Sequence, residues 1–166
     1  MSTMRTLFRF PNPVDERAAR TVAIGVLSLA LVTVVTHQHL LLIPLAYGFA
    51  ARVAAGPRLS PFGLLATRVV VPRLPGPARL TAGPPKRFAQ ALGLCFSASA
   101  LVLALGFQQE RAADVVLLAL IGAAALEGLL GYCVGCRLFA VGMRLGIVPE
   151  QVCEACTNLN LRRTAV

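Results

Sequence analysis

Long apolar stretches alternate with short polar or charged segments along this chain. Residues 21–51 contain no Asp, Glu, Lys or Arg, and neither do residues 88–109. A membrane-spanning helix needs about 20 predominantly apolar residues, so both stretches are long enough to cross a bilayer. The pattern therefore predicts an integral membrane protein built from helices.

The first apolar stretch is too long for a single crossing. As one helix it would extend about 46 Å, whereas the hydrocarbon core of a bilayer is about 30 Å thick. The polar cluster at residues 36–39 is the natural turn, and it divides the stretch into spans at 19–36 and 40–55. Two further spans are predicted at 88–107 and 113–132.

The composition agrees with this pattern. Of 166 residues, 57% are hydrophobic and 14% are charged, and the mean hydropathy is +0.73. Soluble domains carry about 25% charged residues, so this chain lacks the polar groups that would cover a soluble globule. We expect an all-α integral membrane protein, a four-helix bundle that forms a single membrane domain over residues 1–166.

The connection between the second and third spans is apolar but broken by prolines. Residues 59–74 contain Pro61 and Pro72, which leave no uninterrupted run long enough to cross the membrane. This segment is expected to form an interfacial helix on the cytoplasmic leaflet. The Pro- and Gly-rich segments 75–77 and 83–87 are predicted to be loops, because proline stops a helix from continuing.

The positive charges give the orientation. Lys and Arg concentrate in the N-terminal arm, in the connection between the second and third spans, and in the C-terminal tail. The connections at 36–39 and 108–111 carry at most one. Basic residues near span ends stay on the cytoplasmic side, so both termini are expected in the cytoplasm of a bacterium, with the protein in its inner membrane. Arg52, near the end of the second span, is expected to extend its guanidinium to the membrane interface.

The net charge of +9 does not indicate nucleic-acid binding. The basic residues are spread over membrane-flanking segments and have no interleaved aromatic residues on which bases could stack. Attraction to anionic lipid of the inner leaflet explains them, so the lipid bilayer is the expected partner.

Two CxxC motifs follow the last predicted span. Cys133 and Cys136 form the first, and Cys153 and Cys156 form the second. Their spacing suits four thiolates around one metal ion, and each pair also suits a dithiol that cycles with its disulfide. If the last helix continued to about Leu145, the first two β-carbons would lie about 5–6 Å apart, whereas a disulfide prefers about 3.5–4.5 Å. That geometry slightly favours a metal.

The expected compartment limits the sulfur chemistry. Cytoplasmic thiols are kept reduced, so a purely structural disulfide is not expected at this face. Three interpretations stay open: a zinc or iron–sulfur site held by the four cysteines, a redox or persulfide-carrying dithiol, and ordinary cysteines at the membrane interface. Cys95 stands alone and is most simply a small core residue.

Two further groups of polar residues stand out within or beside the spans. Glu127 lies in the fourth span, where a lone carboxylate costs about 2.5–3.5 kcal/mol on insertion scales. We expect it to face the bundle, protonated or paired, either as a proton site near the thiols or as a hydrogen bond between helices. His37 and His39 are weak metal-ligand candidates that would need ligands from another chain.

Five sequence segments carry a family resemblance. They are residues 10–17, 58–63, 83–89, 131–136 and 152–156. Together they resemble the bacterial membrane family described as domain of unknown function 4395 (DUF4395). The sequence motifs resemble those of actinobacterial members most. The resemblance spans nearly the whole chain and implies a membrane bundle with no established activity. Genes of this family occur in genomes together with genes for thioredoxin-like and rhodanese-like sulfur proteins. The resemblance therefore implies a role in sulfur chemistry and suggests such proteins as partners.

The family pattern includes a polar signature before the first span. Asn12 is predicted to cap the first helix, with Pro13 at its first position and Asp15 and Glu16 in its acidic first turn. In the functional alternative, these acidic residues would meet Arg58 or Lys86 at the inner mouth of the bundle, beside the thiols.

We therefore predict a membrane-anchored thiol redox or sulfur-transfer protein that works at the cytoplasmic face. Cys133 and Cys136 would be the primary pair, with Cys153 and Cys156 as resolving partners. The alternative is a four-cysteine zinc or iron–sulfur protein, the only cofactors that these residues suggest. A third class is a small transporter or complex subunit, in which Glu127 matters and the cysteines are structural. The sequence is compatible with an oligomer and does not define the substrate.

Overall fold

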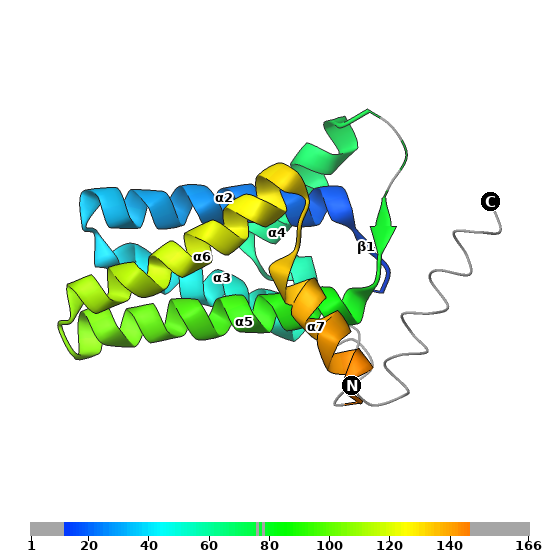
Figure 1. Cartoon of the computed structure of the whole chain (residues 1–166). Coiled ribbons are helices and arrows are strands. Elements are labelled where there is room, and N and C mark those ends of the chain that lie inside the picture. Colours follow the sequence, from blue (N-terminus) through cyan, green and yellow to red (C-terminus); the bar gives the residue numbers. More distant parts are fainter. Residues whose placement is uncertain (1–11, 76, 78, 147–166) are drawn as a thin grey trace, which may run out of the picture.

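The structure, a computed structural model, describes residues 12–75, 77 and 79–146. It confirms the all-α class (Figure 1). Four helical stretches are long and apolar enough to cross a membrane, at residues 16–36, 39–73, 83–106 and 110–130. The assignment of the full chain to one domain stays a prediction.

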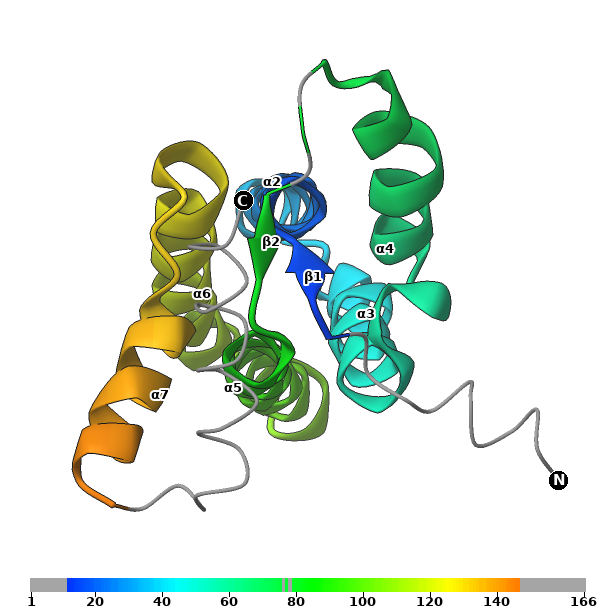
Figure 2. The same ribbon diagram turned by 90° about the vertical axis from the view of Figure 1, so that its right-hand side faces the viewer.

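Four helices run alongside one another and form the bundle: α2 (Glu16–Thr36), α3 (Leu42–Ala55), α5 (Gly83–Leu101) and α6 (Glu110–Leu130). Viewed along the bundle, α2 lies against α6, α6 against α5, and α5 against α3 (Figure 2). A 3-10 turn, His39–Leu41, leads into α3, and a π-helical turn, Val102–Gly106, ends α5. The core between them is aliphatic and includes Leu42, Leu45, Leu117 and Leu120.

The first helix starts at Glu16, before the predicted span at 19–36 and after the predicted first helical position at Pro13, and a different residue caps it. Asp15 is its N-cap and accepts a hydrogen bond from the backbone N–H of Arg17 at 2.9 Å. The capping role predicted for Asn12 was wrong, because its side-chain oxygen accepts the N–H of Gly83 at 3.0 Å, at the start of α5. A short antiparallel pair, β1 (Val14–Asp15) and β2 (Leu80–Thr81), brings these two helix starts together.

The loop predicted at residues 83–87 is instead the first turn of α5. Proline is tolerated in the first helical turn, where its missing N–H would have no intrahelical partner and its fixed φ suits the helix. The prolines after Gly83 therefore begin a helix rather than end one. As a result, Lys86 belongs to the bundle and is buried, with 6% of its surface exposed.

The expected continuation of the fourth span to Leu145 was also wrong. Helix α6 ends at Leu130, and Gly131 follows with φ of 70°, a left-handed conformation that glycine adopts without steric cost. The N–H groups of Gly131 and Tyr132 donate to the carbonyls of Glu127 and Leu126 at 3.1 and 3.0 Å. A separate helix, α7 (Val134–Arg144), then begins in a new direction.

The segment predicted as an interfacial helix at residues 59–74 is helical but irregular. It contains α4 (Pro61–Leu65), a π-helical turn (Ala66–Val70) and a 3-10 turn (Val71–Arg73), after a 3-10 turn at Gly56–Arg58. It packs on α2, where the Phe62 ring lies so close to Gly25 that an added β-carbon would come within 2.9 Å. Its placement at the lipid surface stays a prediction.

Candidate functional site

Two groups of ionisable side chains lie at the two ends of the bundle. One end, here called the thiol end, holds Lys86, Glu127, Cys133 and Cys136, where α5 begins and α6 passes into α7. The other, the histidine end, holds His37, His39, Glu110 and Asp114, where α2 turns into α3 and α6 begins. Figure 1 shows these two regions at opposite ends of the helices.

Helix α7 is held closely against α5. A β-carbon added to Gly135 would lie 2.6 Å from the Cα of Ala89, so glycine is needed for this approach. The rings of Phe88 and Phe139 add an aromatic contact between the same two helices, with centroids 5.6 Å apart. This packing fixes the first turn of α7, and with it the CxxC motif, at the end of the bundle.

The two thiols flank the first turn of α7. Cys133 is the N-cap, with extended backbone angles of φ −88° and ψ 104°, and Cys136 is the third residue of the helix. Both are half-buried and both are free thiols. Because Cys133 is not helical, the spacing calculated for a continuous helix does not apply, and the slight geometric preference for a metal loses its basis.

The two thiols differ in their electrostatics. The pKa of Cys133 is lowered, chiefly by a hydrogen bond from the Cys136 thiol and further by the charge of Lys86, although burial and Glu127 oppose this. The pKa of Cys136 is raised by the same hydrogen bond, by burial and by the charge on Cys133. A helix N-terminus also favours a thiolate at Cys133. The arrangement thus favours the thiolate at Cys133 over the thiolate at Cys136.

A buried ion pair lies beside these thiols. Nζ of Lys86 on α5 is 2.5 Å from Oε1 of Glu127 on α6, and the two side chains are 7% and 14% exposed. Each charge alone would be costly inside a membrane bundle, and their pairing offsets that cost. The acidic Asp15 and Glu16 do not supply the partner of Lys86, since Asp15 pairs with Arg17 at 3.5 Å.

The C-terminus of α6 receives a second cation. Arg20 of α2 donates from Nη2 to the carbonyl of Leu129 at 2.8 Å and from Nε to that of Gly128 at 3.3 Å. The last carbonyls of a helix lack intrahelical partners and carry partial negative charge, so a guanidinium stabilises them. This contact holds the position at which α6 passes into the thiol-bearing turn.

A cavity of about 240 Å³ lies next to Cys133. Residues of α2, α3, α5, α6 and α7 line it, and its walls are mainly apolar. Its polar lining side chains are Arg52, Gln90, Glu127 and Cys133. The sequence placed Arg52 at the interface, but the side chain is 4% exposed and points inward to Gln90 and Ser60.

The remaining cysteine predictions have different outcomes. Cys153 and Cys156 lie outside the described residues, and the four-cysteine metal site stays a prediction. Among the residues that the structure describes, no group of three or more His, Cys, Asp or Glu side chains is placed to hold a metal ion. Cys95 is exposed rather than in the core, because it faces away from the buried Gly93 and Ser97 of α5.

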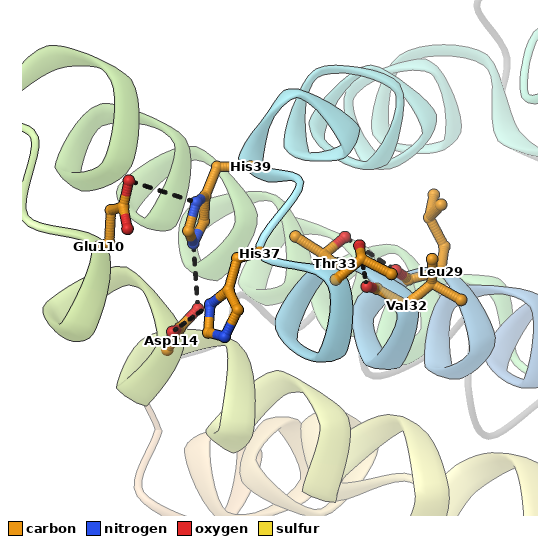
Figure 3. A network of polar contacts seen from close by, with 8 residues as sticks. Leu29, Val32, Thr33, His37, His39, Glu110 and Asp114 are labelled. Atoms are coloured by element: carbon orange, nitrogen blue, oxygen red, sulfur yellow. Dashed lines mark hydrogen bonds and ion pairs between the residues drawn. The ribbon is translucent and has the colours of Figure 1, made fainter.

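The histidine end joins the first turn of the bundle to α6 (Figure 3). Nε2 of His39 lies 3.2 Å from Oδ1 of Asp114, and its Nδ1 lies 4.0 Å from Oε1 of Glu110. Nδ1 of His37 lies 4.0 Å from Oδ2 of the same Asp114. The sequence singled out the two histidines but missed both carboxylates, which are 71 to 77 positions further along the chain in α6 by residue number.

The fold and the site define a class: a helical membrane protein with four candidate spans and a dithiol at one end of its bundle. The family model of domain of unknown function 4395 matches residues 14–144, and the chain belongs to that family. The match covers all the described site residues. No curated protein and no solved structure matches the chain.

Proposed function

We propose that this protein is a membrane-anchored thiol redox or sulfur-transfer protein in which Cys133 attacks and Cys136 resolves. The observation that carries the proposal is the asymmetry of the two thiols at the start of α7. Cys133, the N-cap, has a lowered pKa, and Cys136, one turn later, has a raised one. Because the thiolate is the nucleophile in thiol–disulfide exchange, Cys133 is the attacking group.

The exchange proceeds in two balanced steps. The Cys133 thiolate attacks one sulfur of a partner disulfide, so a mixed disulfide forms and the partner's second sulfur leaves as a thiolate. Cys136 then loses its proton and attacks Sγ of Cys133, which releases the partner's first sulfur and closes the Cys133–Cys136 disulfide. Two electrons pass from this chain to the partner.

The electrostatics favour this order of steps. While Cys133 is a thiolate, its charge and its hydrogen bond with Cys136 hold the second thiol protonated. Forming the mixed disulfide removes that negative charge, and two of the causes that raise the pKa of Cys136 disappear with it. The resolving thiol therefore becomes reactive only after the attacking thiol has bound its substrate.

Sulfur transfer follows from the same geometry. If the partner carries a persulfide, the Cys133 thiolate attacks its outer sulfur, so that Cys133 takes up the persulfide and the partner leaves as a thiolate. Attack by Cys136 on Sγ of Cys133 then releases hydrosulfide and forms the same intramolecular disulfide. Thioredoxin-like and rhodanese-like proteins are the expected partners for the two variants of this chemistry.

The location proposed for this chemistry is the cytoplasmic side of a bacterial inner membrane, with both termini in the cytoplasm. The distribution of basic residues supports it, since the thiol end carries Arg17, Arg20, Lys86 and Arg87, whereas the connections at the histidine end carry only Arg111. A membrane-impermeant maleimide should leave Cys133 unlabelled in intact cells and label it in inverted vesicles. Labelling from outside intact cells would contradict this orientation.

Trapping with a small disulfide tests the proposed roles. The full chain in detergent is treated with oxidised glutathione, and each cysteine is located by peptide mass spectrometry. We expect a glutathione adduct on Cys133 in the Cys136→Ser variant, and a Cys133–Cys136 disulfide in the unsubstituted chain. The Cys133→Ser variant should leave Cys136 without an adduct.

Two results would contradict the proposal. The first is an adduct that accumulates on Cys136 in preference to Cys133. The second is a purified protein that holds one zinc or iron–sulfur centre per chain, by elemental analysis, with all four motif cysteines protected from alkylation. The Cys153→Ser/Cys156→Ser double variant serves as control, because it should retain the Cys133–Cys136 disulfide if the first motif is the primary pair.

A further inference from the structure

A dithiol in a membrane needs an electron acceptor that can reach it, and the cavity beside Cys133 has the features of a binding site for one. Its volume of about 240 Å³ lies below the roughly 300–1,000 Å³ typical of drug-sized ligand pockets, so it suits a single ring system. Phe49 and Phe96 are among its lining residues. Flat aromatic side chains favour a flat ring between them.

The inner wall of the cavity holds an unsatisfied hydrogen-bond donor. Arg52 donates from Nε to Gln90 at 2.6 Å and from Nη1 to Ser60 at 2.9 Å. Its guanidinium stacks on Phe49, with Cζ 4.4 Å from the ring centroid. Its Nη2 is buried and has no hydrogen-bond partner among the described residues.

A buried donor without a partner is costly, so this position calls for an acceptor atom. Arg52 and Gln90 also line a neighbouring cavity of about 200 Å³, and they therefore form the shared wall between the two. Only the larger cavity includes Cys133 in its lining. A ligand in this cavity that accepted a hydrogen bond from Arg52 would lie beside Cys133, the attacking thiol.

The cavity opens to the side of the bundle. Three of its lining residues are exposed: Ala119 of α6, Phe96 of α5 and Leu138 of α7. These helices are neighbours in the end-on view (Figure 2), and all three exposed side chains are apolar. In a bilayer such an opening faces lipid, so the ligand enters from the membrane rather than from water.

We propose that this cavity binds the ring of a lipid-soluble quinone, with a ring oxygen accepting a hydrogen bond from Arg52, and that the quinone accepts the electrons of the Cys133–Cys136 dithiol. The proposal rests on the proposed function, because it names a second electron acceptor for that same dithiol, one that reaches it through the membrane, beside the partner disulfide described above. An acyl chain would fill the apolar space but would leave Nη2 of Arg52 without an acceptor. A quinone meets both requirements, because its ring fills the apolar space and its ring oxygen accepts a hydrogen bond from Nη2 of Arg52.

The reaction balances without any further reactant. The Cys133 thiolate forms a bond to a ring carbon of the quinone, and Cys136 then attacks Sγ of Cys133. The sulfur–carbon bond breaks, its electron pair stays on the ring, and the Cys133–Cys136 disulfide closes. The ring gains two electrons and two protons, one from the Cys136 thiol and one from the water that had taken the proton of Cys133, and leaves as a hydroquinone.

The test is a single turnover of the reduced full chain in detergent, without oxygen. The probe is decylubiquinone, whose fully substituted ring cannot trap a thiol permanently. Quinone absorbance follows its reduction, and mass spectrometry follows the disulfide. We expect one hydroquinone for each Cys133–Cys136 disulfide, and no quinone reduction by the Cys133→Ser variant.

A matched pair of variants locates the reaction. Ala119→Phe narrows the mouth of the cavity, whereas Leu118→Phe alters the adjacent exposed residue, which does not line it. We expect Ala119→Phe to slow oxidation by the quinone about tenfold, the loss that corresponds to one good contact, and Leu118→Phe to leave it unchanged. Both variants should form the disulfide normally with diamide, a small soluble oxidant that does not need the cavity.

The outcomes separate this inference from the proposed function. If diamide forms the Cys133–Cys136 disulfide but decylubiquinone does not, the quinone site is refuted and the thiol chemistry stands. If Ala119→Phe and Leu118→Phe both react with the quinone at the unsubstituted rate, the quinone does not use the cavity and the inference fails. If diamide itself forms no such disulfide, the proposed function fails as well.

Discussion

The polar contacts that attach α6 to its neighbours differ between the two ends of the bundle. At both ends these contacts lie at the edge of an apolar core. The thiol end uses Lys86 and Glu127, which are both largely buried and only 2.5 Å apart. The histidine end uses His39 and Asp114 at 3.2 Å, with His37 and Glu110 in looser contact at 4.0 Å and 70% and 65% exposed.

The two ends differ in burial and in how closely their charges pair. At the histidine end only the His39–Asp114 contact is close, and the exposed His37 and Glu110 contribute little to stability. A buried ion pair costs desolvation, and replacing such a pair with apolar residues is often neutral or stabilising. The thiol end keeps its ion pair beside a cavity and beside Cys133, whose pKa Lys86 lowers and Glu127 raises. Under the proposed function, these charges have a second use in adjusting the reactivity of the thiol.

The largest expected effect comes from breaking the buried pair on one side. Lys86→Met leaves the carboxylate of Glu127 buried without a partner and should destabilise the protein by about 3–5 kcal/mol. Adding Glu127→Leu removes that unpaired charge, so the double variant should recover most of the loss. Thermal unfolding in detergent measures both. A double variant no more stable than Lys86→Met would contradict this account of the pair.

The next effect comes from separating α7 from α5. Gly135→Ala places a methyl group 2.6 Å from the Cα of Ala89 and should cost about 1–3 kcal/mol, as overpacking does. It should also slow closure of the Cys133–Cys136 disulfide with diamide. Gly122→Ala is the control, because nothing lies within 4 Å of its added methyl group. Equal stability of the two variants would show that the close approach is not needed.

A smaller effect tests the hydrogen bond between the thiols. Cys136→Ala removes the donor that lowers the pKa of Cys133 most, so this pKa should rise and alkylation of Cys133 by iodoacetamide should require higher pH. Cys136→Ser retains a hydroxyl donor and should shift the profile less. The rate of alkylation as a function of pH distinguishes them, and identical profiles in both variants would remove the hydrogen bond as the cause.

The smallest effect is expected at the histidine end. His39→Ala removes the contact with Asp114 and should cost about 1 kcal/mol of stability, the usual contribution of one hydrogen bond. It should not change the alkylation profile of Cys133, which lies at the opposite end of the bundle. His37→Ala, at an exposed side chain, should have almost no effect on the thermal unfolding curve. A changed thiol profile in His39→Ala would show that the two ends are coupled.

The helices themselves could be predicted from the sequence because uninterrupted apolar runs specify them. The first three predicted spans follow from the two charge-free stretches and the polar cluster at residues 36–39, and the fourth follows from an apolar run that contains Asp114 and Glu127. The helix boundaries at the thiol end could not be predicted from these apolar runs. Gly83 and its prolines were interpreted as a loop although proline favours the first helical turn. The last helix was expected to continue to about Leu145 although Gly131 ends α6.

The partners of the buried polar residues could not be predicted, because tertiary packing alone brings them together. Lys86 and Glu127 are 41 positions apart, and His39 and Asp114 are 75 apart. One signal was available: a lone cation and a lone carboxylate in apolar surroundings each need a partner. The inward position of Arg52 had no such signal, since a cation near a span end ordinarily extends to the interface.

The most direct test of the central claim is the alkylation of each cysteine in the reduced, unsubstituted chain as a function of pH. Peptide mass spectrometry assigns the iodoacetamide adduct to Cys133 or Cys136. The account predicts that Cys133 reacts at lower pH than a free cysteine, because its pKa is lowered, while Cys136, whose pKa is raised, stays largely unreacted at the pH where Cys133 reacts. Equal reactivity of the two thiols, or faster reaction at Cys136, would contradict it.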